Sequence, residues 1–376
     1  MKALRLHADL ATGNKPATRV RTANASQTFL NPRILLEEAL VPKPRPDELL
    51  IRVRYCGLCG SDFHLAETGH DKKLSYPGLA TLPVTIGHEF SGEVIGHGEG
   101  SREAVMRNFP LGTLLTAEEM QWCGDCHHCR AGNVNHCENL EELGFTEDGA
   151  HAEFITVPAK YCWKLDKLAA RFGSDKALRL GALVEPYAVS FRALFQGTHG
   201  GEWLPGNRVL ILGCGPIGLA AADLALCAGA TEVLAVENVE ERKKFALEIG
   251  VTKAVSSADS SSLTGTFDWI IDAAGATRLA LEIAGARLAV GGTLCLLART
   301  DEPASLLPEA LITKNARVVG SQGHSGESTF SRVIELMAAG KLRAEKLVRE
   351  TISLSEAAER LNHQRKSEGK ILVRPC

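Results

Sequence analysis

A glycine-rich turn between an apolar run and a long Ala/Leu-rich run constrains this chain more than any other feature. The turn reads Gly213-Cys-Gly215-Pro-Ile-Gly218, follows Val209-Leu-Ile-Leu212 and opens the stretch 219–228. Glycines at these positions allow a tight turn, the close approach of a pyrophosphate and the packing of a helix on a sheet. Strand, turn and helix in this order predict a dinucleotide-binding α/β domain. The alternative is a tight strand–helix turn that binds nothing.

Apolar strands and helical stretches alternate around this turn, which is the pattern of a parallel sheet. The sequence predicts strands at 207–212, 232–236, 269–272, 292–297 and 316–320, helices at 186–197, 217–228 and 329–338, and a last strand at 371–373. Between residues 48 and 158 the apolar runs are shorter and broken by Gly, Pro and Asn, which is typical of an irregular β-rich domain. The serine-rich patch 256–263 predicts a surface loop and a dinucleotide domain shortened at that point.

An acidic residue follows the second strand of the dinucleotide domain. Glu237 lies 24 residues past Gly213. A carboxylate there accepts hydrogen bonds from both ribose hydroxyls of adenosine and repels a 2′-phosphate, which favours NAD over NADP. Arg242 could still assist a phosphate. The residues predicted to bind the cofactor are Gly213, Gly215, Pro216, Ile217, Gly218, Glu237 and Arg242.

Four cysteines lie close together in the first half of the chain. Cys123, Cys126, Cys129 and Cys137 have the spacing C-x2-C-x2-C-x7-C. Four thiolates can close around one tetrahedral ion, and zinc in such a closed shell is structural. An iron–sulfur cluster also uses closely spaced cysteines, and free or disulfide-bonded thiols are a third alternative. The wider spacing of the fourth cysteine favours zinc.

A third group of ligand-type residues is spread over three segments. They read Cys56-Gly-Leu-Cys59-Gly-Ser61-Asp62-Phe-His64, Gly87-His88-Glu89 and Glu185-Pro186. Together they offer a thiolate, an imidazole and two carboxylates, and three protein ligands with one open position make a catalytic zinc site. Each segment alone is weak, because a His-Glu pair usually lies at a surface or a helix cap and a C-x-x-C pair fits a redox site. Asp62 would orient an imidazole by accepting a hydrogen bond from the ring nitrogen that does not bind the metal.

The composition argues against several classes of protein. Lys plus Arg is 42 and Asp plus Glu is 45, a formal charge of −3, which does not favour a nucleic-acid surface. The first residues lack the apolar segment of a secretory signal, so 11 cysteines indicate metal or free thiols rather than a disulfide framework. The apolar stretch 209–230 contains Asp223 and Pro216, which argues against a membrane span. We expect a cytoplasmic protein with neither a nucleic acid nor a membrane as partner.

In this order the three groups resemble the zinc-containing medium-chain dehydrogenase/reductase family, the alcohol and polyol dehydrogenases. The resemblance covers nearly the whole chain. It implies α/β architecture with a GroES-like β-rich catalytic domain at 1–190 and 325–376, a structural zinc lobe at about 118–140, and a Rossmann domain with a doubly wound parallel sheet at 191–324. It also implies NAD, two zinc ions per chain, a small-molecule substrate and a homo-oligomer, either a tetramer or a dimer.

The resemblance assigns the catalytic zinc ligands. Cys59 and His88 match ligand positions, and the four clustered cysteines match the structural zinc lobe. Glu89 and Glu185 both stand where relatives supply a carboxylate, so the third ligand is open between them.

The resemblance also assigns a proton path. Ser61 and His64 fall where the family keeps a hydroxyl and a histidine for proton relay, and Cys56 matches a packing position. In the family, zinc polarises the oxygen of an alcohol and the adjacent carbon passes a hydride to the nicotinamide.

Three stretches, 117–126, 135–145 and 320–326, are similar to cyclitol dehydrogenases, which act on inositol-type or aminocyclitol rings. Glu118 and Glu119 stand where a simple alcohol would need apolar residues, and carboxylates accept hydrogen bonds from a polyhydroxylated ring. A solvated charge pair is an equally good explanation of these two residues.

Two more residues are candidates for substrate contact. Glu153 matches a family segment near the active site, and His324 either touches the substrate or cofactor or shapes a turn. The alternative substrate is an acyclic polyol or amino alcohol of the sorbitol, butanediol or threonine type. A zinc-free binding module and a redox protein are the rival classes, which metal analysis would separate.

Overall fold

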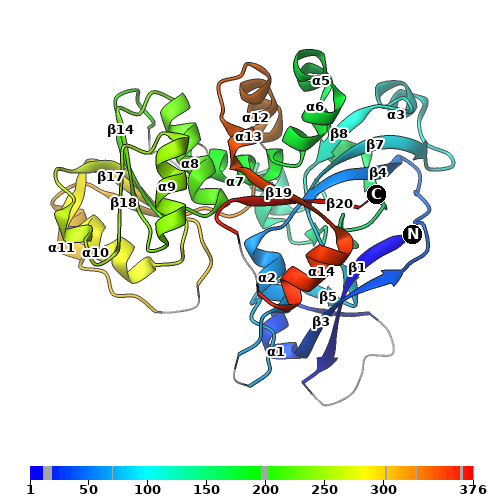
Figure 1. The fold of residues 1–376 in the computed structure, drawn as a ribbon, viewed down its shortest axis with the longest axis horizontal. Helices are drawn as coiled ribbons and strands as arrows, with labels where there is room; N and C mark the ends of the chain where they lie inside the picture. The colour runs from blue at the N-terminus through cyan, green and yellow to red at the C-terminus, as the bar shows by residue number, and fades with distance from the viewer. Residues whose placement is uncertain are drawn as a thin grey trace. The chain divides into compact units, whose positions relative to one another are not determined.

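The computed structural model describes residues 1–11, 19–69, 71–195, 202–300, 303–326, 328–364 and 367–375. The chain divides into two compact units, Met1–Glu185 with Val348–Cys376, and Pro186–Leu347 (Figure 1). The domain bounds expected at 190 and 325 stay a prediction.

The first unit is rich in strands. They are β1 (Lys2–Leu10), β2 (Val20–Thr22), β3 (Phe29–Glu38), β4 (Glu48–Gly57), β5 (Ala80–Leu82), β6 (Val84–Thr85), β7 (Glu89–His97), β8 (Leu114–Ala117), β9 (Met120–Gln121), β10 (Glu141–Glu142), β11 (Phe154–Pro158), β12 (Cys162–Lys164), β19 (Val348–Ser353) and β20 (Lys370–Arg374). Its helices are α1 (Ala25–Thr28), α2 (Gly60–Ala66), α3 (Glu103–Asn108), α4 (His127–Arg130), α5 (Asp166–Phe172), α6 (Ser174–Gly181) and α14 (Leu354–Asn362), and α7 (Val184–Phe195) begins at its end.

In the largest sheet of this unit, strand β20 from the C-terminal segment pairs with strand β4 from the first sixty residues, and β19 pairs with β20. Its order in the described residues is β12-β8-β7-β4-β20-β19, with β11 also paired to β4. Leu49, Ile51 and Val53 alternate along β4 as buried residues, which is the period-2 pattern of a strand with one face in the core. Strand β20 is antiparallel to β4 and lies beside the point where β4 leads into α2. The predicted strand at 371–373 is therefore confirmed, and it lies next to the candidate site.

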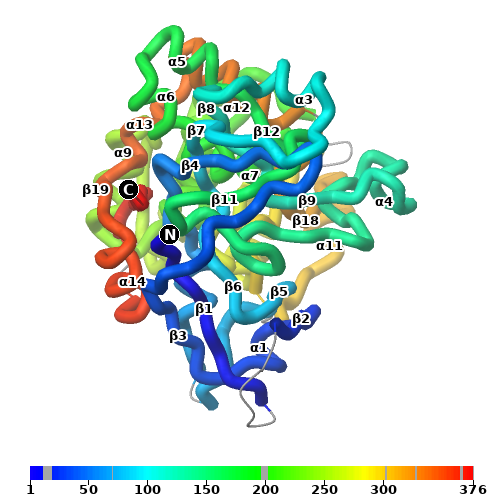
Figure 2. Tube along the Cα trace, turned by 90° about the vertical axis from the view of Figure 1, so that its right-hand side faces the viewer, coloured from blue at the N-terminus to red at the C-terminus, as the bar shows by residue number. Residues whose placement is uncertain are grey.

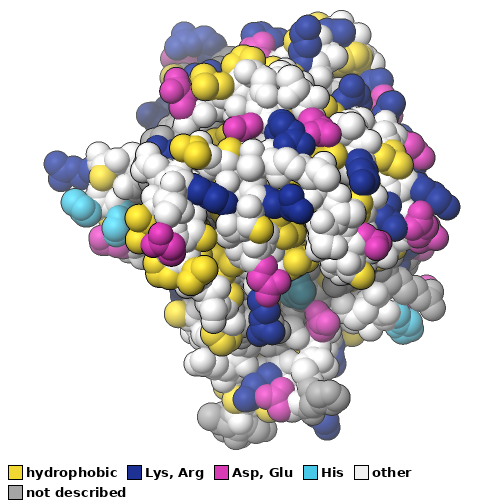
Figure 3. Space-filling model, turned by 90° about the vertical axis from the view of Figure 1, so that its left-hand side faces the viewer, with side chains coloured by type: hydrophobic (Ala, Val, Ile, Leu, Met, Phe, Trp, Pro, Cys, Tyr) yellow, Lys and Arg dark blue, Asp and Glu magenta, His cyan; other side chains and the backbone are white. Residues whose placement is uncertain are grey.

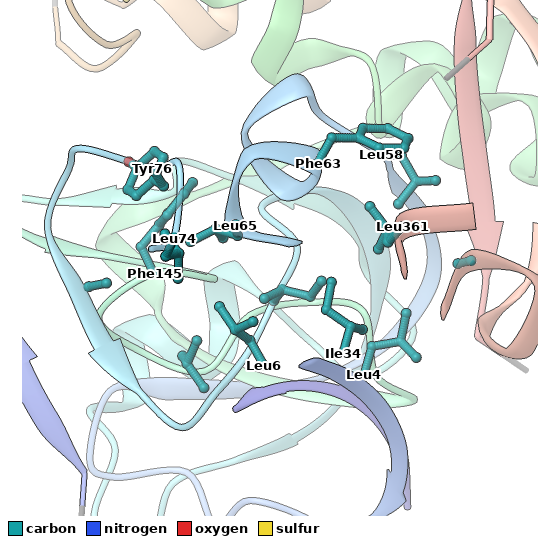
Figure 4. Close-up of a cluster of buried hydrophobic side chains, with 14 of the residues drawn as sticks. Leu4, Leu6, Ile34, Leu58, Phe63, Leu65, Leu74, Tyr76, Phe145 and Leu361 are labelled. Carbon is teal, nitrogen blue, oxygen red and sulfur yellow. The ribbon is translucent and has the colours of Figure 1, made fainter. Parts of the chain in front are cut away.

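A cluster of buried apolar side chains supports the β1–β3 side of this unit (Figure 4). It joins residues from β1, β3, α2 and α14, including Leu6, Ile34 and Leu361. Phe145 stacks on Tyr76 with ring centroids 5.1 Å apart, and it also meets the His88 ring at 4.9 Å. The core thus fixes one face of a predicted metal ligand.

The second unit is a parallel α/β sheet. Its strands are β13 (Arg208–Leu212), β14 (Glu232–Val236), β15 (Lys253–Val255), β16 (Phe267–Asp272), β17 (Leu288–Leu296) and β18 (Arg317–Gly320). Its helices are α8 (Pro216–Cys227), α9 (Glu240–Ile249), α10 (Thr277–Arg287), α11 (Pro308–Ile312), α12 (Thr329–Ala338) and α13 (Ala344–Leu347).

The strand order of this sheet, in the described residues, is β15-β14-β13-β16-β17-β18, and each pairing is parallel. The order reverses between β14 and β16 around β13, which is the switch point where doubly wound folds bind ligands. Strand β15 was not predicted. The serine-rich patch lies in the loop between β15 and β16, which contains the short 3-10 helix Ser260–Ser262. Both strands are in place, and the shortening of the domain stays a prediction.

The surface carries charges of both signs. On the face in Figure 3, Lys and Arg side chains alternate with Asp and Glu side chains, and apolar side chains are scattered among them. This agrees with the near balance of 42 basic and 45 acidic residues. Among the described residues, no helix combines the length and the apolar character needed to cross a bilayer.

Candidate functional site

The start of α2 places a thiol and a hydroxyl of the predicted catalytic site. Cys59 is the residue that caps this helix, and its backbone N–H donates to Asp62 Oδ2 at 2.9 Å. Ser61 lies in the first turn, and its Oγ is 3.5 Å from Nε2 of His88. The capped turn therefore holds Cys59 and Ser61 on the same side as the His88 ring.

The start of β7 supplies the imidazole and a carboxylate. His88 precedes the strand and Glu89 is its first residue, and both are buried. Cys59 Sγ, a ring nitrogen of His88 and a carboxylate oxygen of Glu89 all lie within 4.8 Å of one another. The structure therefore brings together three donors that the sequence separates into two segments.

A lysine that the sequence reasoning missed lies against this group. Lys370, the first residue of β20, is 1% exposed, and its Nζ donates to Glu89 Oε1 at 2.7 Å, to Glu89 Oε2 at 2.6 Å and to the carbonyl of Leu58 at 3.0 Å. Burial alone lowers the pKa of Lys370, but Glu89, Cys59 and Glu185 outweigh it and raise that pKa. Lys370 is therefore a buried ammonium within the candidate site.

A buried carboxylate lies behind the site between two imidazoles. Asp62 is 0% exposed, with Oδ1 3.9 Å from His88 Nδ1 and Oδ2 3.6 Å from Nε2 of the fully buried His151. Burial raises the pKa of Asp62, but the two histidines and the Cys59 amide outweigh it and lower that pKa. Asp62 is placed as predicted, behind His88. His151 was missed because a single histidine among apolar residues carries no local signal.

The electrostatics of this group favour a bound cation. Burial lowers the pKa of His88, but Cys59, Asp62 and Glu185 raise it well above its usual value. The surroundings thus stabilise positive charge at the imidazole, and His88 Nδ1 and Asp62 Oδ1 are buried without a hydrogen-bond partner. A thiolate, an imidazole and carboxylates are the ligand types that zinc takes in catalytic sites, so these residues fit zinc.

The remaining acidic candidates fall into different environments. A carboxylate oxygen of Glu119 lies within 4.8 Å of one of Glu185, and both residues are buried. Glu118 accepts hydrogen bonds from the indole N–H of Trp163 at 2.9 Å and that of Trp122 at 3.4 Å. Neither Glu118 nor Glu119 is therefore part of a solvated pair.

Two other candidates have local partners. Glu153 Oε2 accepts from the Lys2 backbone N–H at 2.8 Å, which ties it to β1. His64 is half exposed, three residues past Ser61 on α2, with Nδ1 3.0 Å from Glu67 Oε2. Whether Glu153 meets a substrate stays a prediction.

The four clustered cysteines converge around a single point. Their sulfur atoms lie within 4.8 Å of one another, with Cys123–Cys137 at 3.5 Å, Cys126–Cys137 at 3.9 Å and Cys123–Cys129 at 4.0 Å. Four thiolates about 2.3 Å from one tetrahedral ion stand about 3.8 Å apart, whereas a cluster of several irons needs a wider cage. The lobe with α4, at the right margin of Figure 2, therefore fits a structural zinc site.

Backbone amides prepare this lobe for a metal. The N–H groups of Asp125 and Cys126 donate to Cys123 Sγ, and they lower the pKa of that thiol to about 6. The N–H groups of Cys123 and Asn139 donate to Cys137 Sγ, both at 3.3 Å. Amide donors stabilise the negative charge of a thiolate. The backbone of this loop therefore favours the deprotonated form of the cysteines, which is the form that binds a metal.

The glycine turn of the second unit has the predicted form. Gly213 has φ of 91°, and a Cβ at Gly218 would lie 1.9 Å from the Gly213 carbonyl oxygen. A Cβ at Gly215 would meet nothing within 4 Å, so the space in front of the turn is open. Pro216 and Ile217 are the first residues of α8, whose N-terminal amides favour an anion. The turn therefore fits a pyrophosphate.

Glu237 is held rigidly beside this turn. Its Oε2 accepts from the Cys214 backbone N–H at 2.9 Å, and its Oε1 accepts from the N–H groups of Asn238 and Val239 at 2.8 and 2.9 Å. Arg242 is close enough to oppose the rise in the pKa of Cys214, which burial brings to about 12.

His324, in the second unit, is fully buried. Its ring packs edge-on against Phe330 with centroids 5.2 Å apart, and its Nδ1 is 3.3 Å from Ser325 Oγ.

Known proteins match both units. The alcohol dehydrogenase GroES-like domain matches residues 45–167, and the zinc-binding dehydrogenase domain matches residues 216–339. Scyllo-inosose 3-dehydrogenase of Thermotoga maritima is 39% identical over 381 residues, which cover 96% of this chain and 95% of that protein. The chain belongs to the zinc-binding alcohol dehydrogenase family. The predicted family, the fold class of a GroES-like and a Rossmann domain, and dehydrogenase chemistry on CH–OH groups are thereby confirmed.

Other members of the family are similar over most of the chain. L-threonine 3-dehydrogenase of Caldanaerobacter subterraneus is 30% identical, with 89% of this chain and 93% of that protein covered. A structure ascribed to an alcohol dehydrogenase from Thermotoga maritima has a TM-score of 0.89 and 36% identity, and it covers 100% of both chains. A Sinorhizobium meliloti structure ascribed to a zinc-binding dehydrogenase and bound to NADP has a TM-score of 0.78 and 27% identity, with 99% of this chain and 100% of that one covered.

Proposed function

We propose that this zinc-type dehydrogenase exchanges a hydride between NAD and a ring CH–OH group of a cyclitol, of the inositol or aminocyclitol type. The observation that carries the substrate class is the buried Glu119 carboxylate beside Glu185. A buried carboxylate can accept hydrogen bonds from the vicinal hydroxyls of a ring, which an aliphatic alcohol does not offer. The 39% identity to a relative named for scyllo-inosose supports the same substrate class.

The preference for NAD rests on Glu237. Three backbone N–H groups fix its carboxylate beside the glycine turn. A fixed negative charge accepts ribose hydroxyls and repels a 2′-phosphate. Arg242 lies near enough to act on Cys214, and a related structure holds NADP, so the cofactor has to be tested with both dinucleotides.

Two zinc sites are part of the proposal. Cys59 and His88, with a carboxylate from Glu89 or Glu185, hold the catalytic ion, and the four clustered cysteines hold the structural one. When bound, zinc supplies Lewis-acid polarisation of a substrate oxygen and the nicotinamide supplies the hydride acceptor. Cytoplasmic location and a dimeric or tetrameric assembly stay predictions.

The chain's own residues move the proton. Ser61 Oγ lies 3.5 Å from His88 Nε2, so it stands beside the imidazole that would hold the metal and accepts the proton of a substrate hydroxyl. His64, three residues further along α2 and half exposed, passes that proton to water. In the direction of ketone reduction, the same two groups deliver it.

The test is turnover by the purified, zinc-replete enzyme with NAD⁺ and with NADP⁺. The substrates are myo-inositol, scyllo-inosose and aminocyclitols, beside sorbitol, 2,3-butanediol and L-threonine. Cys59→Ala is the inactive control, and Cys227→Ala, at the end of α8, is the matched cysteine control. We expect NAD⁺-dependent activity on a cyclitol that Cys59→Ala abolishes and Cys227→Ala retains. Activity confined to the acyclic substrates would refute the cyclitol assignment, and a preference for NADP⁺ would refute the role of Glu237.

A further inference from the structure

A buried carboxylate joins two tryptophans next to the four-cysteine lobe. Glu118, the first residue after β8, is 4% exposed. Its Oε1 accepts the indole N–H of Trp163 on β12 at 2.9 Å, and its Oε2 accepts that of Trp122 at 3.4 Å. Trp122 directly precedes Cys123, the first cysteine of the lobe. One side chain therefore links a strand of the large sheet to the start of the lobe.

The segment before β12 fixes the other groups of Trp122. The Tyr161 hydroxyl and the Lys160 ammonium both donate to the Trp122 carbonyl, the latter at 3.1 Å. The ammonium also lies 5.0 Å from the centre of the Trp122 ring and 4.7 Å from that of the Tyr161 ring, which are cation–π distances. The two rings meet edge-on with centroids 5.7 Å apart. The carbonyl, the indole N–H and the ring of Trp122 are thus all held, and we call this cluster the tryptophan clasp: Glu118, Trp122, Lys160, Tyr161 and Trp163.

The clasp holds the chain on both sides of Glu119. Glu118 precedes Glu119 directly, and its backbone N–H donates to the Tyr161 carbonyl at 3.0 Å. Trp122 follows three residues later. The two adjacent carboxylates have different neighbours, because Glu118 bonds the two indoles, whereas an oxygen of Glu119 lies within 4.8 Å of one of Glu185.

The pair of Glu119 and Glu185 needs such support. Both residues are buried, and two carboxylates this close repel each other when both are ionised. A rotation of the chain that carries Glu119 away from Glu185 would relieve the repulsion. The clasp opposes this rotation, because it fixes the backbone before and after Glu119.

We propose that Glu118 is a positioning residue that fastens the start of the lobe to the sheet through Trp122 and Trp163 and so keeps the Glu119 carboxylate beside Glu185, where the ring hydroxyls of the substrate bind. This inference rests on the proposed function, which gives Glu119 the contact with the substrate. It removes Glu118 from the predicted substrate contacts, and it gives the two tryptophans a part in substrate selection.

The kinetic half of the test compares glutamine variants of the zinc-replete enzyme. Glu118→Gln keeps the shape of the side chain, but its amide offers one acceptor oxygen to two indole donors. We expect the KM for the cyclitol to rise by roughly fivefold and kcat to change by less than about twofold, since a misplaced Glu119 weakens substrate binding and leaves hydride transfer intact. Glu119→Gln should raise KM at least as much. Glu138→Gln, exposed in the same lobe, is the matched control and should change neither constant.

Quenching of tryptophan fluorescence by acrylamide measures the clasp without any substrate. The chain has four tryptophans. Replacing Trp203 of the second unit by Phe leaves the two clasp tryptophans and Trp269, which is 2% exposed, so in this background acrylamide reaches mainly the clasp. Adding Glu118→Gln should raise the quenching constant and shift the emission to longer wavelength, because the indoles become more accessible to water. Adding Glu138→Gln should change neither.

A second variant covers the case in which Glu118→Gln does not fold. Trp122→Phe keeps the ring and the buried charge and removes one indole N–H from the clasp. It should also raise the KM for the cyclitol and leave kcat nearly unchanged. Its matched control is Trp203→Phe, which removes an indole N–H bonded at 3.0 Å to the Ala228 carbonyl, away from the clasp.

Two results would overturn the inference. One is a KM that Glu119→Gln raises and Glu118→Gln leaves unchanged, and the other is equal acrylamide quenching in Glu118→Gln and Glu138→Gln. An unaltered KM in Glu119→Gln, or an enzyme that turns over no cyclitol, would count against the proposed substrate, and the quenching comparison would then decide on the clasp alone.

Discussion

Replacing Gly57 by Ala would place a methyl group where the Glu89 carboxylate lies. The added Cβ would stand 2.2 Å from Glu89 Oε2 and 3.2 Å from Glu89 Cβ, and ordinary contact begins at 3.4 Å. The oxygen must therefore move by about 1.2 Å, the difference between 2.2 and 3.4 Å. A displacement of this size directed away from Lys370 Nζ would lengthen their bond, now 2.6 Å, beyond hydrogen-bond range.

The loss in free energy of unfolding depends on which hydrogen bonds Lys370 retains in the variant. A buried ion pair that loses one partner outright costs about 3–5 kcal/mol. In Gly57→Ala, Lys370 retains the Leu58 carbonyl and can keep Glu89 Oε1, so we expect the loss of one charged hydrogen bond, about 1.5–3 kcal/mol. For a unit of this size each kcal/mol lowers the melting temperature by about 2–4 °C, which predicts a fall of roughly 3–12 °C.

Scanning calorimetry at a fixed zinc concentration measures this shift. The matched control is Gly96→Ala on β7, the strand that carries Glu89, where the new Cβ would meet Leu50 at an ordinary 3.5 Å. Its melting temperature should stay within about 2 °C of the unmodified enzyme. Equal melting temperatures for the two variants would refute the argument that the glycine at 57 makes room for the buried pair.

Three further predictions concern other parts of the chain. Cys129→Ser should remove one zinc per chain and lower the melting temperature, because a closed thiolate shell supplies folding free energy; an unchanged zinc content in metal analysis would contradict the structural zinc lobe. Glu237→Gln keeps the shape of the side chain but removes its charge, so the ratio of kcat/KM for NAD⁺ to that for NADP⁺ should fall by about tenfold, and a steady-state comparison that finds the ratio unchanged would show that Glu237 does not select the cofactor. The Arg102 backbone N–H, bonded to Asp47 at 2.8 Å, lowers the pKa of that carboxyl below 3.8. The contribution of Asp47 is therefore present above about pH 4 and lost as the pH falls through the lowered pKa, and the stability difference between the unmodified enzyme and Asp47→Asn should shrink in urea titrations below pH 4 but not above it.

The parts of the molecule that depend on local signals were predictable from the sequence. The glycine turn predicted both the end of β13 and the start of α8, because few other sequences fold into that turn. The strand 232–236 and the helix 329–338 were predicted with the bounds that the structure has. Strand β15 was missed because its three residues, Lys253–Val255, show neither a clear alternation nor an apolar run.

In the cysteine lobe, the spacing of the cysteines in the sequence leaves the metal open, and the distances between their sulfur atoms identify it. The sequence left zinc and an iron–sulfur cluster open, since both use closely spaced thiolates. Sulfur–sulfur distances of 3.5 to 4.0 Å decide for a single ion, because they are set by how the loop folds back on itself. Similarly, Glu118 and Glu119 look equivalent in the sequence, and only the two indole donors on Glu118 distinguish them.

Lys370 shows why the rest of the site could not be predicted from the sequence. Its strand was predicted from three apolar residues, but a lysine at the edge of an apolar run ordinarily extends its ammonium to water. What buries it here is the order of the sheet, which places β20 beside β4 and brings together residues separated by 281 positions in the chain. The one local clue is Gly57, a glycine at the end of a strand, where the absence of a side chain signals a close approach by another group. A catalytic site of this kind is therefore read from the sequence ligand by ligand, whereas the buried ammonium that pairs with Glu89 is placed there by the topology.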